Sequence, residues 1–112
     1  MNPNVIKEVK RELKAIKTNA TKKEINKLNL SKFSPLFSDT CIYGQMTGFC
    51  CSDRAKELYP KTLTSITNTS DKNNAYYSYL EYFLFKRKCD RDVHKKIIDY
   101  LKDDRKGLNF IK

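Results

Sequence analysis

The chain has 112 residues, of which 39% are hydrophobic and 12% aromatic. This length suits one domain with one modest core and excludes a large enzyme with a separate substrate domain, while the apolar content excludes wholesale disorder. Twenty-three Lys and Arg against thirteen Asp and Glu give a formal net charge of +10. Such an excess favours binding to phosphates, acidic proteins or anionic surfaces.

The charge is unevenly distributed along the chain. Residues 1–32 carry nine Lys and Arg against three Glu, residues 33–74 carry four charges of each sign, and residues 75–112 carry ten basic against six acidic residues. We expect one domain over residues 1–112, with a basic helical N-terminal region, a loop-rich centre and a C-terminal helical region. The fold class we predict is all-α, a compact bundle of about four to five short helices.

The first predicted helix runs from Val5 to Lys17. Its apolar residues Val5, Ile6, Val9, Leu13 and Ile16 fall on one face at helical spacing. Glu8 and Glu12 are placed on one flank. The opposite face gathers five cations, which can neutralise successive phosphates or can serve as the solvated face of an amphipathic helix. We favour the binding interpretation for these residues: Lys7, Lys10, Arg11, Lys14 and Lys17.

A second, shorter helix is predicted to follow, holding Ile25 and Leu28. Thr21 and Glu24 have the spacing of a capping box, in which each side chain bonds the other residue's free amide. Lys22 and Lys23 extend the basic surface along this helix. From Phe33 to Asp39 the chain should form an ordered loop around Pro35, packed by Phe33, Leu36 and Phe37.

The centre from Tyr43 to Arg54 contains two of the three glycines. Backbone amides there could approach an anion with Arg54 nearby, although a tight structural turn is the stronger interpretation. Tyr43, Gln45 and Arg54 are candidate partner contacts. Ser52 should cap a helix over Asp53–Tyr59, ended by Pro60, and the Thr-, Ser- and Asn-rich residues 63–74 should form a mobile connection.

The aromatic segment from Ala75 to Lys88 is predicted to be the central buried helix, with a strand as the alternative. Asp90 should cap a last helix with an inward stripe, Gly107 suits its C-terminal turn, and the apolar end of the chain should fold back on the core. Four cations after the aromatic helix are either a binding cluster or a response to the negative helix end. They are Lys86, Arg87, Lys88 and Arg91.

No metal, cofactor or catalytic site is expected. Cys41, Cys50, Cys51 and Cys89 lack the paired spacing of a zinc site and should be thiols in a reducing compartment. The only histidine, His94, should be a hydrogen-bonded structural residue rather than the base of a Cys nucleophile. The longest uncharged stretch, residues 40–52, is too short and polar to span a bilayer, and no secretion signal is evident. We expect a cytoplasmic, non-enzymatic protein without membrane contact.

Residues 43–58, YGQMTGFCCSDRAKEL, resemble a segment of small proteins of phages and mobile elements. In style the whole chain is similar to phage-encoded host-takeover and anti-CRISPR proteins, which are short, single-domain and strongly charged. The resemblance implies binding to a host nuclease or its guide RNA, in the host cytoplasm if the chain is phage-encoded. It transfers no site residues because the group has no common motif. Since anti-CRISPR proteins are often acidic, the charge of +10 favours contact with RNA, DNA or an acidic protein face.

Two functional hypotheses follow. The leading one is a non-catalytic inhibitor or accessory protein that presents the cations of the first helix to nucleic acid or to a ribonucleoprotein such as a host nuclease complex. The alternative is a sequence-tolerant DNA- or RNA-binding regulator, although no helix-turn-helix pattern is evident. An enzymatic reading would depend on Cys50 or Cys51. The sequence leaves the partner and the oligomeric state open.

Overall fold

A computed structural model describes residues 3–34, 39–49, 52–59, 78–87, 90–103 and 105–111. Within these ranges the chain forms six α-helices and one short 3₁₀ helix, and no strand. The all-α prediction is therefore confirmed. In chain order the elements are α1 (Pro3–Asn19), α2 (Lys22–Asn26), η1 (Leu30–Lys32), α3 (Ile42–Thr47), α4 (Asp53–Leu58), α5 (Tyr79–Lys86) and α6 (Arg91–Lys102).

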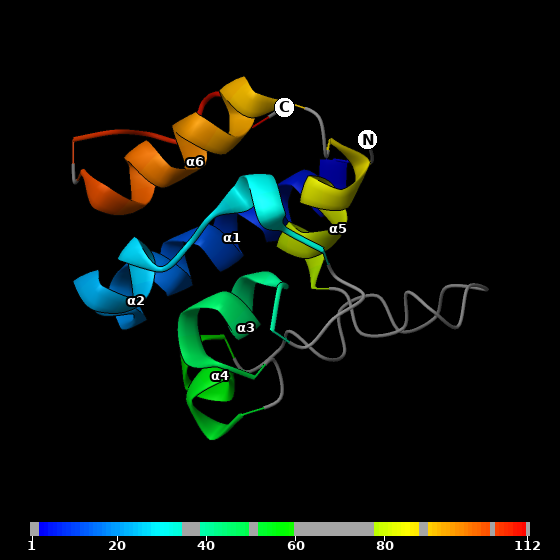
Figure 1. The fold of residues 1–112 in the computed structure, drawn as a ribbon. Helices are drawn as coiled ribbons and strands as arrows, with labels where there is room; N and C mark the ends of the chain where they lie inside the picture. The colour runs from blue at the N-terminus through cyan, green and yellow to red at the C-terminus, as the bar shows by residue number, and fades with distance from the viewer. Residues whose placement is uncertain are drawn as a thin grey trace.

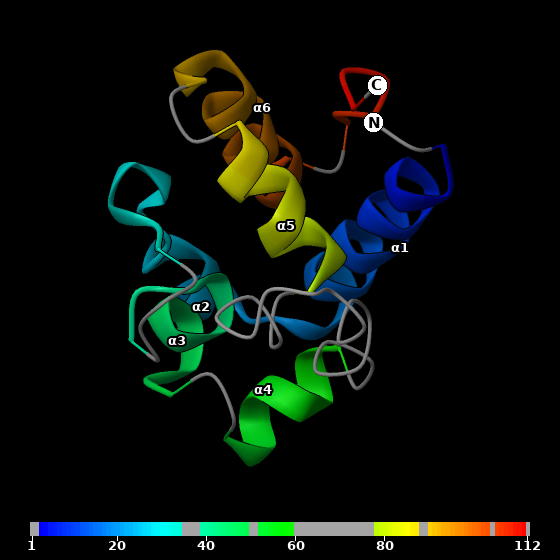
Figure 2. The same ribbon diagram turned by 90° about the vertical axis from the view of Figure 1, so that its right-hand side faces the viewer.

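Helix α1 is the element around which the others are arranged. It packs against α4, α5 and α6, while α2 packs against α3 and α6 (Figure 1). Figure 2, turned by 90° about the vertical axis, shows α5 lying against α1, with α3 and α4 together at the lower end. Val9, Leu13 and Ile16 of α1 have no exposed surface and enter the core, as their spacing predicted.

The core is one contiguous cluster to which every α-helix contributes. Its largest fully buried side chains include Tyr43 of α3 and Phe83 of α5. Leu108 and Ile111 also pack into it, so the apolar end of the chain folds back on the bundle as predicted.

The predicted caps explain where several helices begin. Thr21 and Glu24 form the capping box of α2 through reciprocal bonds of 3.1 and 2.9 Å. Ser52 accepts from Ala55 N at the start of α4, and Asp90 accepts from Val93 N at the start of α6, both at 3.1 Å. Each cap satisfies an amide that has no partner inside its helix. These three predictions are confirmed.

Helix α3 was not predicted, because the two glycines of its region suggested a turn. The Cys41 sulfur accepts from Gly44 N at 3.3 Å to cap it, and Gly48, with φ of 94°, ends it in the left-handed conformation that glycine adopts at low cost. The first glycine is thus inside a helix and the second is a C-cap. Gly44 N and Gly48 N are both bonded within the chain, so neither glycine amide is open to an anion, and the preferred structural interpretation of the glycines holds.

The ends of the C-terminal elements also differ from the predictions. The aromatic segment is a helix rather than a strand, and the part described as α5 begins at Tyr79 with Ser78 as its cap. Helix α6 ends at Lys102 with Asp103 as its C-cap, so Gly107 does not serve its C-terminal turn. Residues 63–74 and the loop positions Leu36 and Phe37 lie outside the described residues.

Candidate nucleic-acid interface

Three lysines form the open part of the predicted basic face of α1. Lys7 and Lys14 are exposed and Lys10 is half-buried, and none of the three makes an ion pair with a described residue. On a helix of about 3.6 residues per turn they follow one side, opposite the buried stripe. We call this set of Lys7, Lys10 and Lys14 the α1 basic face.

The other two predicted cations of α1 have local partners. Arg11 pairs with Glu8 at 3.1 Å, one turn before it. Lys17 donates to the carbonyl oxygen of Asp103 at 3.0 Å, and its ammonium lies 4.1 Å from the centroid of the Tyr100 ring. Arg11 is therefore exposed as predicted but paired with an acid, whereas the prediction that Lys17 lies on the open face is wrong because it is half-buried and tied to α6.

The charge continues from α1 into a groove at the C-terminal ends of α1 and α6. The groove has a volume of about 480 Å³, and we call it the lysine groove. Lys22, which is exposed, opens onto it, whereas the exposed Lys23 is not part of its lining. Its lining residues are Lys17, Ala20, Lys22, Ile25, Asn26, Leu101 and Lys102. No acidic residue is among them.

Two cations of the second predicted cluster stack on aromatic rings. Lys86 Nζ lies 5.5 Å from the centroid of the Tyr82 ring, and Arg87 Cζ lies 4.7 Å from the centroid of the Phe83 ring. These stacked positions explain the two cations structurally, since ring faces attract positive charge. Arg91 is exposed at the start of α6, and Lys88 lies outside the described residues.

Tyr43 is buried, so its predicted role as a partner contact is wrong, whereas Gln45 is half-buried and bonded within the chain. Tyr43 is only 1% exposed. The Gln45 amide donates to the carbonyl oxygens of Asn29 and Thr40 at 3.2 and 2.9 Å, and its oxygen accepts from Asn29 N at 2.6 Å. Gln45 thereby joins the segment before η1 to α3.

Arg54 is also occupied by internal bonds rather than directed at an anion. Its guanidinium donates to both oxygens of Glu24 at 2.8 and 2.7 Å and to the carbonyl oxygen of Asn19 at 2.9 Å, and it pairs with Glu57 at 3.1 Å. The hydrogen bond from Arg54 lowers the pKa of Glu24 to about 2. Arg54 therefore connects α4 to α2.

The residues that sequence reasoning missed are two acids inside the core. Glu12 is 0% exposed and Glu81 is 4% exposed. Glu12 accepts from the Tyr43 hydroxyl and, at 2.9 Å, from Leu80 N. Glu81 accepts from Ile42 N at 3.3 Å. Both acids thereby join α1 or α5 to a neighbouring element, and the prediction that Glu12 is on the helix flank is wrong.

Burial changes the charge state of this acid pair. Loss of solvation raises the pKa of Glu12 to about 7 and that of Glu81 to about 8, and each acid is further disfavoured as an anion by a neighbouring carboxyl. Ser78 hydrogen-bonds to both, which opposes the increase. Burial also raises the pKa of Tyr43, which faces Glu12. Both acids are buried and bonded to neighbouring elements, so we assign the cluster a structural role.

One signal in the sequence could have identified Glu12. At about 100° per residue, Glu12 lies only about 20° from Val5 on the helical projection of α1, at the edge of the apolar face. Glu81 could have been suspected because it is the only acid in α5, whose other residues before Lys86 are all apolar or aromatic. Burial of both acids depends on tertiary partners, which local pattern does not reveal.

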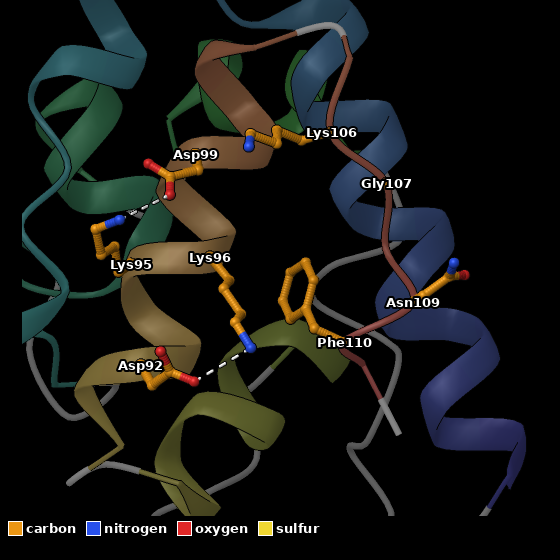
Figure 3. Close-up of a pocket in the computed structure, with 8 residues that line it drawn as sticks. All are labelled: Asp92, Lys95, Lys96, Asp99, Lys106, Gly107, Asn109 and Phe110. Carbon is orange, nitrogen blue, oxygen red and sulfur yellow. Dashed lines mark hydrogen bonds and ion pairs between the residues drawn. The ribbon is translucent and has the colours of Figure 1, made fainter.

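A second groove is lined by lysines that are paired with aspartates. It lies between α6 and the C-terminal segment, with a volume of about 420 Å³ (Figure 3). Lys95 pairs with Asp99 at 3.3 Å and Lys96 with Asp92 at 3.2 Å, one turn apart on α6. This groove therefore offers less positive charge to an anion than the lysine groove.

Cysteine and histidine chemistry does not assemble in the described part of the chain. Cys41 is a buried free thiol, while Cys50, Cys51 and Cys89 lie outside the described residues. No group of three metal-ligating side chains occurs in the described ranges. His94 is buried, at 8% exposed, but its Nε2 has no hydrogen-bond partner among the described residues, so the prediction of a hydrogen-bonded histidine is wrong for this atom. Burial lowers the pKa of His94.

No helix of the described ranges is long and apolar enough to cross a membrane. Comparison with known proteins gave no matching family model, no matching curated protein and no matching solved structure.

Proposed function

We propose that this protein is a non-catalytic nucleic-acid-binding protein that uses the α1 basic face as its primary contact. The observation that supports this proposal is the set of three lysines on one side of α1 that have no acidic partner among the described residues. A row of ammonium groups can neutralise successive phosphates and release their counterions. Such binding is tolerant of base sequence.

The lysine groove lengthens this surface. Lys17 belongs to both α1 and the groove, so the positive charge runs from the middle of α1 to the ends of α2 and α6. The acids that do occur on α1 face elsewhere, because Glu12 is buried and Glu8 pairs with Arg11. A phosphate backbone on this side meets mainly cations.

The test is the salt dependence of binding to a random-sequence 20-base-pair DNA and to a single-stranded RNA. The variant with Lys7→Gln, Lys10→Gln and Lys14→Gln should bind duplex DNA at least about ten-fold more weakly. It should also reduce the slope of log affinity against log salt by about 2 to 3, since each phosphate contact contributes about 0.9.

A second triple variant, Lys95→Gln, Lys96→Gln and Arg105→Gln, is the matched control. It has the same net charge, but each substituted cation is paired with an aspartate in the folded protein. The proposal requires a clearly smaller loss of affinity in this control. Equal losses in both variants would mean that only total charge matters, and absence of wild-type binding would reject the function.

A narrower form of the proposal is that the partner is a host CRISPR nuclease or its guide RNA. It is supported by the similarity in style of the whole chain to anti-CRISPR proteins. Within residues 43–58, which resemble a segment of phage proteins, Phe49 is 51% exposed and is the one exposed large hydrophobic residue of the described ranges. The experiment measures how strongly the wild-type protein and the Phe49→Ser variant inhibit loading of the guide RNA into the nuclease. Loss of inhibition in that variant supports the narrower form, and absence of inhibition by wild type rejects it.

A further inference from the structure

The lysine groove differs from the rest of the basic surface because its cations converge on one hollow. Lys17 comes from the last turn of α1, Lys22 from the first turn of α2 and Lys102 from the last residue of α6. Three separate elements therefore contribute lysines to the lining of the same space, which has a volume of about 480 Å³. That volume is within the range of small-molecule sites.

The residues that line the groove include no acid, although the Asp103 carboxylate acts on Lys17 from outside the lining. Lys22 and Lys102 make no ion pair with a described residue, whereas the lysines of α6 that line the groove of Figure 3 are paired with Asp92 and Asp99. Bringing like charges together costs free energy that an anion would recover. The imbalance indicates a ligand with more than one negative charge.

Complementing helix dipoles accounts for only two of the three cations. Lys17 and Lys102 lie at helix C-terminal ends, where a cation is favourable. Lys22 is the first residue of α2, where the dipole disfavours a cation and an acid is the usual choice. The dipole of α2 therefore does not explain the position of Lys22.

One of the three ammonium groups is held in place before any ligand arrives. Lys17 Nζ donates to the carbonyl oxygen of Asp103 at 3.0 Å and stacks on Tyr100. A cation fixed in this way loses little conformational entropy when a ligand binds. Beside the lysines, Ile25 and Leu101 supply an apolar floor and Asn26 a side-chain amide. The groove thus combines cations with room for an uncharged body.

We propose that the lysine groove binds a phosphate monoester, either the terminal phosphate of a nucleic-acid strand or the phosphate of a small phosphorylated molecule. A monoester carries about −1.5 to −2 charges at neutral pH, against about −1 for an internal phosphodiester, so it matches the convergence of three lysines better. This inference deepens the proposed function and, for the nucleic-acid source, rests on it.

The experiment compares single-stranded 10-mers of one sequence that carry a 5′-phosphate, a 3′-phosphate or hydroxyl ends, by fluorescence anisotropy. At least one phosphorylated strand should bind about ten-fold more tightly than the hydroxyl strand. A hydroxyl-ended 12-mer controls for the added charge. The preference should vanish in the variant Lys22→Gln, Lys102→Gln and persist in the control variant Lys95→Gln, Lys96→Gln, with unchanged melting temperatures showing that both fold.

Titration with adenosine 5′-monophosphate and with inorganic phosphate distinguishes the two sources. If the monophosphate binds alone, and binding needs Lys22 and Lys102, the groove accepts a free small molecule. If only phosphorylated strands show the preference, the source is a nucleic-acid end. Equal binding of all strands, with no binding of the monophosphate, overturns the inference. The proposed function would survive that result if the α1 variant still weakens binding of every strand.

Discussion

At the scale of single residues, the buried acids Glu12 and Glu81 dominate the pH response. Their pKa values of about 7 and 8 are above the usual 4.5, so the folded state holds their protons more tightly than the unfolded state does. Stability from these groups is complete below about pH 4.5 and decreases as the pH rises through 7 and 8. Glu24 behaves in the opposite way. Its lowered pKa stabilises the folded state above about pH 4.5, and this stabilisation is lost as the pH falls toward 2.

We therefore predict that the free energy of unfolding falls by several kcal/mol between pH 5 and pH 8.5, at about 1.4 kcal/mol per unit of pKa difference. Glu12→Gln, which imitates the protonated acid, should flatten this decrease. Urea denaturation at a series of pH values measures it. Glu57→Gln, at an exposed position, is the control and should keep the wild-type slope. A wild type equally stable at both pH values contradicts the assignment.

At the scale of elements, the end of α3 depends on the conformation of one glycine. Gly48 has φ of 94°, and a β-carbon added there would meet no atom within 4 Å. Gly48→Ala should lower the free energy of unfolding by about 1 kcal/mol through backbone strain alone. Gly107 has equal space but no left-handed φ, so Gly107→Ala should be neutral or slightly stabilising. Urea denaturation compares them, and equal effects would contradict this explanation.

The same scale shows how far the sequence alone could lead. The apolar stripe of α1 and the caps at Thr21, Ser52 and Asp90 were predictable because each depends on residues within a turn or two. Helix α3 was missed because its cap is a cysteine and its third residue is a glycine, both unusual choices.

The candidate site was predictable only in part, for a related reason. That α1 has an outer basic side followed from its periodicity. The bonds that occupy Arg54 and Lys17 join residues 30 and 86 positions apart, so no local pattern reveals them. Lys102 entered the site for the same reason, since the groove exists only once α6 lies beside α2.

At the scale of the whole molecule, the net charge of +10 makes the folded protein repel itself. The ion pairs of Arg11, Lys95 and Lys96 join residues three or four positions apart and are exposed, so each contributes only a few tenths of a kcal/mol. Repulsion among the remaining cations should therefore exceed these attractions. Salt screens both, but the larger effect decides the sign.

We predict that raising NaCl from about 20 to 200 mM stabilises the protein by about 1 kcal/mol, or roughly 5 °C in melting temperature. Self-repulsion grows with the square of the charge. The variant with Lys7→Gln, Lys10→Gln and Lys14→Gln, at 10 − 3 = +7, should therefore show about half the increase. Calorimetry with chloride as the only anion in solution measures the melting temperature of both proteins. A melting temperature that falls with added salt would mean that the attraction within the surface ion pairs exceeds the repulsion among the cations. The cations of α1 would then not destabilise the fold through mutual repulsion.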